Sequence, residues 1–510
     1  MRGMKLLRMA MTFIAVVFLF SIIGPQTGLS GQATWGATAA ERALNGIKAL
    51  MDAGKVKRGE NFKIMIHSGQ RGQLAPVVEK LNRLTGLNAE VVVIGFEPDI
   101  HTKAMNEAVV KSGQFDLFLG FSNWTGDFAE AGLIVPLDEW VAKYSPEVDQ
   151  GPNAFVAPLD RFTTRYKGKF YALGMDNDAF VLFYRKDLFN DPTERGNFKA
   201  KYGRLLTLPE TWKEFDQLAE FFDRPAKGIR GAHLYSTRFF TYTSWAPRFV
   251  SKGGIYFDPK TMNPMINTSG GVKALQEHID VTQKHMFAEA YTGDWSVSYD
   301  RFPAGQIFMA VAWPSLGQFA EDPEVSKIAG KVGFAKFPGS RLKGKLIRAT
   351  PHVVGWSLTV SRYGKSPEVG YLIAQWLNSP SVSTEVITTK GTLDPFRQNH
   401  FENRKLMQTY GPELGPVLRK NTEQSFPDIS LRGSNEYLDV LNLNLQSAVT
   451  GQISAKAALE KTAAKWQEIT NRLGRKEQLK AWQSEIKGYP RHIRELWVDL
   501  GKVSPVMAGL

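Results

Sequence analysis

The feature of this chain that most restricts its fold is a regular alternation of strand-like and helix-like segments. Residues 62–69, 89–96 and 115–121 are apolar and rich in β-branched and aromatic side chains, which predicts strands. Residues 74–86 and 101–113 have apolar side chains at helical spacing, and each segment ends in glycine, as many helices do. Strands that alternate with helices of this length form βαβ units with parallel strands. The sequence therefore predicts an α/β protein.

A second block of alternating elements follows further along the chain. Thr211 and Glu214 have the spacing of a capping box, which predicts a helix that begins there. Residues 231–237, 306–313 and 331–337 are predicted strands. Because 510 residues are too many for one hydrophobic core, the two blocks indicate two α/β lobes.

The first residues resemble an export signal. Arg2, Lys5 and Arg8 precede an apolar segment, residues 9–23, which is too short to span a bilayer comfortably. We expect residues 1–33 to be a signal peptide that is cleaved after Ala33, and the mature protein to be soluble and periplasmic. The chain has no cysteine, which excludes disulfides, thiolate metal sites and a lipidated N-terminal cysteine.

The chain is basic, with a formal net charge of +13. Its 63 lysines and arginines are spread among 50 acidic residues, without an arginine-rich run or a repeat of basic and aromatic residues. This distribution is unlike that of a nucleic-acid-binding protein. We expect a monomer with no nucleic-acid partner.

Three polar residues interrupt an otherwise apolar run, residues 171–186. Asp176 and Asp178 share one face of an extended chain, and Asn177 points to the other. Burial of two adjacent carboxylates without partners costs several kcal/mol, so they should meet water, a donor-rich ligand or a cation. We interpret the segment as a wetted crossing between two lobes, across a cleft. The alternative is a solvent-exposed sheet edge.

The order and spacing of several segments resemble family 1 of the extracellular solute-binding proteins. This resemblance implies two doubly wound α/β lobes, joined by crossing segments around a central cleft. It also implies a solute held in that cleft and delivered to an inner-membrane ABC permease. The segments that resemble the family are residues 115–140, 168–189, 208–215, 302–317, 353–380 and 451–469.

On this basis the chain after the signal peptide divides into three parts. Residues 59–177 and 357–425 are assigned to lobe 1, and residues 178–356 and 426–474 to lobe 2. Residues 475–510, which are basic and show no strand pattern, are assigned to a C-terminal extension.

The resemblance also implies positions for the solute contacts. Tryptophan and tyrosine rings there would cover the C–H faces of a sugar or polyol, while carboxylates and amides bind its hydroxyls. We expect no catalytic residue, cofactor or metal. The expected ligand-binding residues are Gln70, Arg71, Asn123, Trp124, Asp176, Asp178, Tyr242, Ser244, Trp245, Trp313 and Trp356, with His67 as a weaker candidate.

Three alternatives remain open at this stage. An anionic solute such as a glycerol phosphate could be held by Arg71 or Arg397. A glycoside-processing enzyme could use Asp176 and Asp178 as its carboxylate pair, but that mechanism needs groups on both sides of the substrate. A metal-binding protein is a third possibility, although the sequence has no known metal motif. We interpret His278 and His285, two turns apart on a predicted helix, as surface residues.

Overall fold

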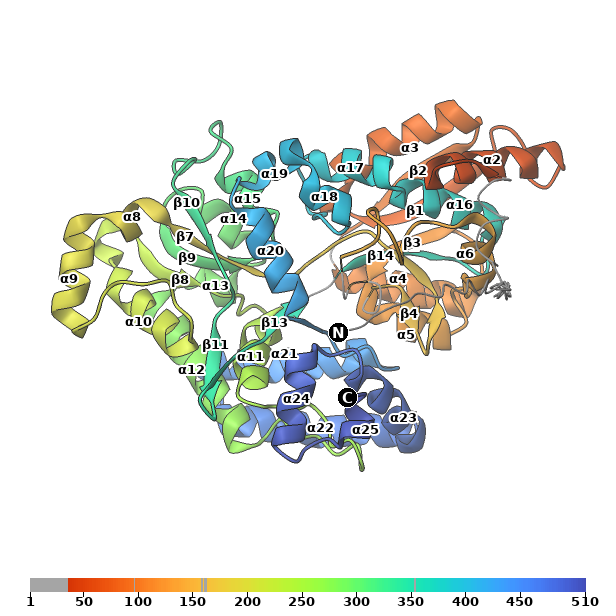
Figure 1. Cartoon of the computed structure of the whole chain (residues 1–510). Helices are drawn as coiled ribbons and strands as arrows, with labels where there is room; N and C mark the ends of the chain where they lie inside the picture. The colour runs from red at the N-terminus through yellow and green to blue at the C-terminus, as the bar shows by residue number, and fades with distance from the viewer. Residues whose placement is uncertain (1–34, 96, 157–158, 160–162, 353–354) are drawn as a thin grey trace, which may run out of the picture.

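The computed structural model describes residues 35–510, apart from residues 96, 157–158, 160–162 and 353–354. The expected signal peptide, residues 1–33, lies outside the described residues. Two α/β lobes lie side by side, and a group of C-terminal helices lies along both of them (Figure 1). The predicted fold class, two α/β lobes with crossing segments, is confirmed.

The sheet of the first lobe has the order β2-β1-β3-β14-β6. Strands β2, β1 and β3 are parallel, as the βαβ pattern predicts, and β14 pairs antiparallel with both β3 and β6. Strand β3 is apolar and almost fully buried because helices cover both faces of the sheet. The strands are β1 (Asn61–His67), β2 (Asn88–Ile94), β3 (Leu117–Phe121), β6 (Ala172–Gly174) and β14 (Trp356–Val360).

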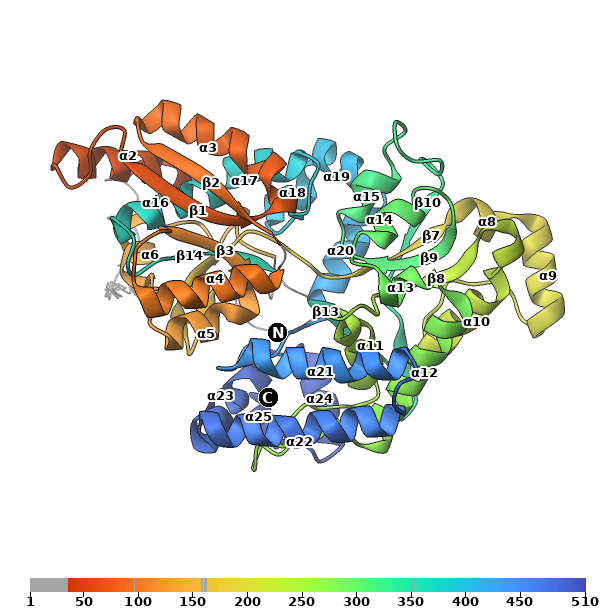
Figure 2. The same cartoon turned by 180° about the vertical axis from the view of Figure 1, so that it is seen from behind.

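The helices of the first lobe form two layers, one on each side of its sheet (Figures 1 and 2). The first layer contains α2 (Ala39–Asp52), α3 (Arg71–Thr85), α16 (Pro367–Asn378) and α17 (Pro380–Thr388), and the second contains α4 (Glu97–Val110) and α5 (Thr125–Glu130). Helix α6 (Asp138–Tyr144) and the hairpin of β4 (Arg165–Tyr166) and β5 (Lys169–Phe170) complete the lobe.

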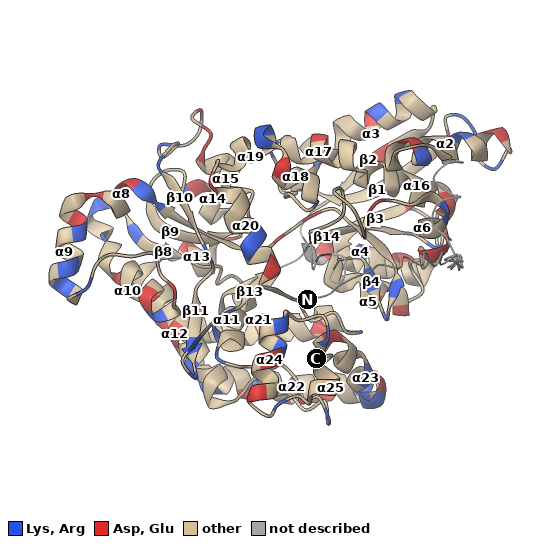
Figure 3. Ribbon diagram, viewed as in Figure 1, with Lys and Arg blue, Asp and Glu red and all other residues tan. Residues whose placement is uncertain are grey.

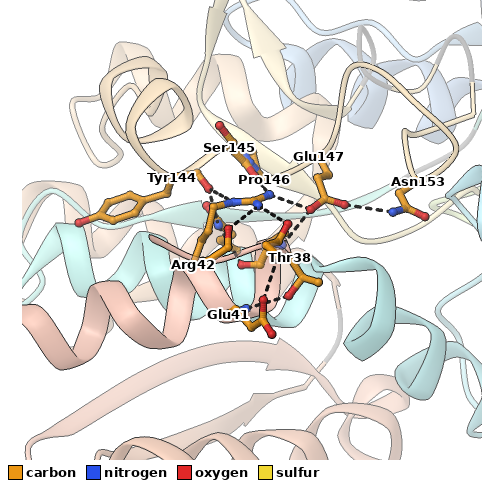
Figure 4. Close-up of polar contacts among 12 residues, drawn as sticks. Thr38, Glu41, Arg42, Tyr144, Ser145, Pro146, Glu147 and Asn153 are labelled. Atoms are coloured by element: carbon orange, nitrogen blue, oxygen red, sulfur yellow. Dashed lines mark hydrogen bonds and ion pairs between the residues drawn. The ribbon is translucent and has the colours of Figure 1, made fainter. Parts of the chain in front are cut away.

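Helix α2 lies in the polar lead-in, where no element is predicted. It begins with a capping box between Thr38 and Glu41. Arg42 fixes the helix to the loop after α6: Nε and Nη2 donate to the carbonyl oxygens of Tyr144 (3.0 Å) and Ser145 (2.7 Å). Nη2 also pairs with the carboxylate of Glu147 at 2.7 Å (Figure 4). The buried guanidinium therefore has the partners that its burial requires.

The sheet of the second lobe has the order β10-β7-β9-β8, in which β8 and β9 are parallel. The capping box predicted at Thr211 and Glu214 is confirmed, and helix α10 begins there. The strands are β7 (Val181–Arg185), β8 (Arg230–His233), β9 (Ile307–Ala312) and β10 (Val332–Ala335). The helices are α8 (Lys186–Asn190), α9 (Pro192–Tyr202), α10 (Trp212–Phe222), α11 (Thr241–Ser251), α12 (Ser269–His285), α13 (Glu289–Thr292), α14 (Val297–Arg301) and α15 (Leu316–Ala320).

Three chain segments connect the lobes. Residues 175–180 lead from β6 to β7, and this is the crossing expected for the acidic stretch. The second segment follows the hairpin of β11 (Gly339–Leu342) and β12 (Lys345–Arg348) and leads through β13 (Thr350–His352) to β14. The third follows α17 and contains α18 (Gln398–Glu402), α19 (Arg404–Tyr410), α20 (Leu414–Glu423) and β15 (Ser425–Pro427). Strands β13 and β15 pair in parallel, so two of the crossings lie side by side.

The C-terminal helices form a layer that contacts both lobes (Figure 2). They are α21 (Ser434–Val449), α22 (Ala455–Leu473), α23 (Arg475–Ile486), α24 (Arg491–Asp499) and α25 (Pro505–Ala508). The residues after position 474 pack on the second lobe: Trp482 and Trp497 are buried, and their Nε1 groups donate to the carbonyl oxygens of Phe257 and Gly254 at 2.9 Å each. On the other side, Ser434 Oγ donates to the carbonyl oxygen of Asn123 at 2.8 Å.

Basic and acidic residues are interspersed over the outer helices of both lobes (Figure 3). Many form exposed pairs, such as Lys80 with Glu385. Among the described helices, none combines the length and the hydrophobicity that crossing a bilayer requires.

Candidate functional site

An aromatic pocket lies between the two lobes, beside the crossing that contains Asp178. It encloses about 40 Å³, and side chains from both lobes line it. The lining residues are His67, Phe121, Trp356 and Thr392 from the first lobe and its connections, Asp178 from the crossing, and Phe240, Trp295, Tyr299, Trp313 and Ser315 from the second lobe.

The first lobe places three of these rings at one edge of its sheet. His67 ends β1 and Phe121 ends β3, at the carboxyl edge where ligands bind in open α/β sheets. Trp356 begins the antiparallel strand β14 and is the register partner of Phe121. The Phe121 and Trp356 rings meet edge to face with centroids 4.6 Å apart, and His67 stacks on Trp356 at 5.6 Å. Burial lowers the pKa of His67 to about 4, so its imidazole is neutral at physiological pH.

The second lobe supplies the opposite wall of this pocket. Trp313 follows β9 and packs edge-on against Phe180 and Phe240, with ring centroids 5.1 and 5.3 Å away. Its side chain is buried, yet the indole Nε1–H has no acceptor among the described residues. Tyr299 and Ser315 join their hydroxyls at 2.7 Å. The pocket thus has apolar walls and a few polar groups that can point at a ligand.

A second hollow adjoins this pocket and shares Phe121 and Phe240 with it. It encloses about 80 Å³ and is lined by Phe121, Asn123, Trp124, Phe239, Phe240, Tyr242, Asn435, Leu438, Asp439 and Asn442. Trp124 stacks on Phe121 with centroids 4.3 Å apart. Asn123 Oδ1 is buried and has no donor among the described residues. The two hollows together form one interlobe cleft, with α21 closing its far end.

The acids of the crossing are buried, so the expectation that water reaches them is wrong. Asp176 and Asp178 are 1 % and 2 % exposed. The segment after α17 covers Asp176, whose Oδ1 accepts from the backbone N–H of Asp394 at 2.6 Å. Asp178 Oδ2 accepts from the N–H of Gly355, on the second crossing, at 2.9 Å. Packing of three chain segments against one another excludes water from the crossing.

Burial changes the ionisation of these acids. It raises the pKa of Asp176, Asp178 and Asp394 well above the usual range, because a carboxylate in a dry environment loses its hydration. Neighbouring carboxylates raise each pKa further. Asn177 points away from the acids, as the alternation predicts, and its Nδ2 donates to Thr422 Oγ1 at 3.0 Å.

Six of the eleven expected ligand-binding residues line the cleft: Asn123, Trp124, Asp178, Tyr242, Trp313 and Trp356. The weaker candidate His67 lines it as well. Asp176 lies behind the wall formed by Asp178.

The other four expected residues lie elsewhere. Gln70 is buried under its own loop, where its Oε1 accepts from the N–H of His67 at 3.0 Å, and Arg71 is exposed at the start of α3. Ser244 and Trp245 are buried within α11. Trp245 stacks on a phenylalanine one turn further along, and its Nε1 donates to the carbonyl oxygen of Gly271 at 3.1 Å.

The structure also shows where the residues proposed for the alternative functions lie. Arg397 is fully buried in the first lobe, where it donates to the carbonyl oxygens of Glu147 (2.6 Å), Asn153 (2.6 Å) and Asn378 (2.9 Å). It lines neither hollow of the cleft. The interpretation of His278 as a surface residue is wrong: its side chain is buried and Nε2 lies 3.1 Å from Ser236 Oγ.

A larger hollow of about 1010 Å³ lies on the outside of the second lobe, between α10, α12 and β11. Most of its polar lining is already paired within the protein: Asp216 pairs with the buried Arg248 (2.6 Å), and Lys252 pairs with Glu277 (2.7 Å). Its lining residues all belong to the second lobe and to β11. The interlobe cleft is therefore the better candidate site, although it is smaller.

Sequence reasoning missed several residues of the cleft, notably Phe240, Trp295 and Tyr299. They lie in short loops and helices of the second lobe, where no periodic pattern indicates which side chain faces the first lobe. The sequence could have indicated Phe121 as a cleft residue, because it ends a predicted strand at the carboxyl edge of the sheet.

The chain is similar to known proteins both in sequence and in structure. The family model described as bacterial extracellular solute-binding protein matches residues 75–383. A maltotriose-binding protein of Pyrococcus abyssi is 24 % identical over 63 % of this chain and 75 % of its own length. A mannitol-binding protein of Pseudomonas aeruginosa is 21 % identical over 71 % of this chain and 81 % of its own length. The crystal structure of an ABC-transporter solute-binding protein from Agrobacterium radiobacter, in complex with ribitol, superposes with a TM-score of 0.70. That structure is 22 % identical, and the match covers 81 % of this chain and 99 % of that one.

Proposed function

Since the chain belongs to the bacterial extracellular solute-binding proteins, we propose that it captures a neutral sugar or polyol between its lobes and delivers it to an ABC permease of the inner membrane. The solute would bind without chemical change. We also propose that the protein acts in the periplasm, as a monomer, after removal of its signal peptide.

The proposal rests mainly on the composition of the interlobe cleft. Aromatic rings from both lobes face one another there, and such rings suit the C–H faces of a sugar or polyol. Two buried polar atoms of opposite type, the Trp313 Nε1–H donor and the Asn123 Oδ1 acceptor, have no partner among the described residues. A hydroxyl can both donate and accept, so a polyol matches both atoms.

Contacts from two lobes explain how capture would work. A solute that touches Trp356 and Trp313 at once gains contacts from both lobes only when the lobes are together. Binding then shifts the equilibrium between open and closed arrangements by that difference in affinity. The relatives named for maltotriose and mannitol, and the solved ribitol complex, support the same class of solute.

The alternatives have less support. An anionic solute needs a cationic partner, and no lysine or arginine lines either hollow of the described cleft. Arg397 is occupied by carbonyl oxygens, and Arg71 is exposed outside the cleft. A glycosidase needs carboxyl groups on both sides of its substrate, whereas Asp176 and Asp178 lie against each other on one side.

A ligand screen by thermal unfolding tests the proposal. Sugars, polyols and their phosphates are each added to the mature protein, because a bound ligand raises the unfolding midpoint. We expect a neutral sugar or polyol to raise the midpoint, and isothermal titration to give one solute per chain. The variant Trp356→Leu, which loses a wall of the cleft, should lose the shift. A response to phosphorylated compounds alone, or conversion of the solute to a product, would contradict the proposal.

A further inference from the structure

Three buried carboxylates meet at the point where the chain crosses between the lobes. Asp176, Asp178 and Asp394 each direct one carboxylate oxygen into a common space, and these three oxygens lie within 4.8 Å of one another. The side chains are 1 %, 2 % and 0 % exposed. We call these three residues the acid cluster.

The acid cluster has too few donors for its oxygens. The Oδ2 atom of Asp176 is buried and lacks a hydrogen-bond donor among the described residues. Ser315 and the Tyr410 hydroxyl lie close enough to Asp394 to lower its pKa, but neither donates a hydrogen bond of good geometry to its carboxylate oxygens. No lysine, arginine or histidine in the described part of the chain forms an ion pair with any of the three acids; the charges that act most strongly on them come from other carboxylates. Isolated carboxylates in a dry protein interior are costly, so the cluster requires a positive partner or protons.

We propose that Asp176, Asp178 and Asp394 bind a divalent cation of the oxygen-seeking kind, with calcium as the best match. Calcium takes six to eight oxygen ligands at about 2.3–2.6 Å, from carboxylates in one- or two-oxygen contact, in a flexible geometry. Three oxygens within 4.8 Å of one another can therefore contact one such ion. The cluster contains no imidazole or thiolate, the ligands that favour zinc and copper.

The position of the acid cluster gives the cation a structural role. Asp176 and Asp178 belong to the first crossing, and Asp394 belongs to the segment that follows α17 and leads into the third crossing. A cation would join these two segments. It would also lie one side chain from the solute, because Asp178 lines the aromatic pocket.

Metal titration of the whole mature chain tests this proposal and requires no solute. Protein passed over a chelating resin is titrated with calcium, magnesium or sodium chloride at constant ionic strength. Thermal unfolding and elemental analysis are the measurements. We expect one calcium per chain, and an unfolding midpoint that rises with the logarithm of the calcium concentration. Calcium binding should strengthen as pH rises, because the ion competes with protons for the carboxylates.

Variants identify the site. Asp394→Asn, at a residue that does not itself line the aromatic pocket, should weaken calcium binding at least tenfold. The matched control is Asp116→Asn, a buried aspartate of the first lobe whose oxygens accept from the N–H groups of Lys63 (2.8 Å) and Lys365 (2.9 Å). This control should keep the calcium response of the parent even if it is less stable.

Three results would overturn the proposal. The first is a parent protein that binds no calcium and shows no shift of the midpoint at millimolar calcium, which would mean that protons alone neutralise the cluster. The second is an Asp394→Asn variant with an unchanged calcium response, which would place the ion elsewhere. If that variant does not fold, terbium luminescence of the parent protein replaces it: tryptophan-sensitised emission that calcium displaces is expected, and its absence is the third result. A failed solute screen leaves the proposal intact.

Discussion

Two buried tryptophans of the second lobe, Trp313 and Trp245, allow a direct test of the candidate site. Both are expected from the sequence to contact the solute, and both are almost fully buried. In the structure they differ in the hydrogen bonding of their Nε1–H groups. Trp313 lines the cleft and its Nε1–H has no acceptor among the described residues, whereas the Nε1–H of Trp245 donates to the carbonyl oxygen of Gly271 at 3.1 Å. Replacing each by phenylalanine removes the same atoms from two different environments.

The expected magnitudes follow from this difference. A neutral hydrogen bond contributes about 0.5–1.5 kcal/mol, so Trp313→Phe should weaken binding of a hydroxylated solute by roughly twofold to tenfold. Trp245→Phe should leave the affinity unchanged. The loss of its bond to Gly271 should lower the free energy of unfolding by about 1 kcal/mol more than the loss in Trp313→Phe, because the ring contraction is the same in both variants.

The assay combines isothermal titration, using the solute that the screen identifies, with unfolding in urea. The reasoning predicts opposite patterns: weaker binding with little additional loss of stability for Trp313→Phe, and lower stability with normal binding for Trp245→Phe. Equal loss of affinity in both variants would mean that the cleft extends to α11. Unchanged affinity in Trp313→Phe would remove its indole N–H from the solute contacts.

Two further predictions concern buried ionisable side chains outside the cleft. Arg397→Met should lower the free energy of unfolding by at least about 3 kcal/mol, because three carbonyl oxygens lose a buried donor. Solute affinity of the folded variant should be unchanged. A loss of affinity measured by titration would restore the anionic-solute alternative. Glu485 accepts from the N–H of Ser430 at 3.0 Å, and burial raises its pKa to about 8. The folded protein therefore holds a proton that the unfolded chain releases above about pH 4.5, so this residue's contribution to stability is full in acid and is lost as pH rises toward 8. Glu485→Gln should match the parent near pH 4 and exceed it by about 3 kcal/mol at pH 7 in urea unfolding; equal stability at both pH values would contradict the assignment.

Most of the fold could be predicted because local patterns and tertiary packing agree. Strand β1 begins within one residue of the predicted segment 62–69, and β3 lies inside the predicted segment 115–121. Helix α2 was missed although its start has a capping-box pattern, Thr38 followed by Glu41. Its buried residues Ala39, Ala43, Ile47 and Leu50 have helical spacing, so the sequence could also have predicted this helix.

The site could be predicted only in part. Strand ends give the direction of His67, Phe121 and Trp356, since parallel strands present their carboxyl ends at one edge. By contrast, Trp313 and Trp245 are indistinguishable by residue type, and only the packing of α11 shows that one of them faces the core of its own lobe. The acids were expected in water for a sound energetic reason, but the sequence does not show that residues near Asp394, more than 200 positions away, cover them.

The burial of the acid cluster bears on how the lobes move. An ionised carboxylate is more stable in water than in a dry crossing, so the three acids favour any arrangement of the lobes that admits water to them. A cation, or protons on the carboxyls, removes that preference. A solute has the opposite effect to ionisation, because rings of both lobes enclose it only when the lobes are together. Both effects involve Asp178, because this residue belongs to the acid cluster and also lines the aromatic pocket. Cation and solute should therefore be linked, and each should change the affinity for the other by the same factor.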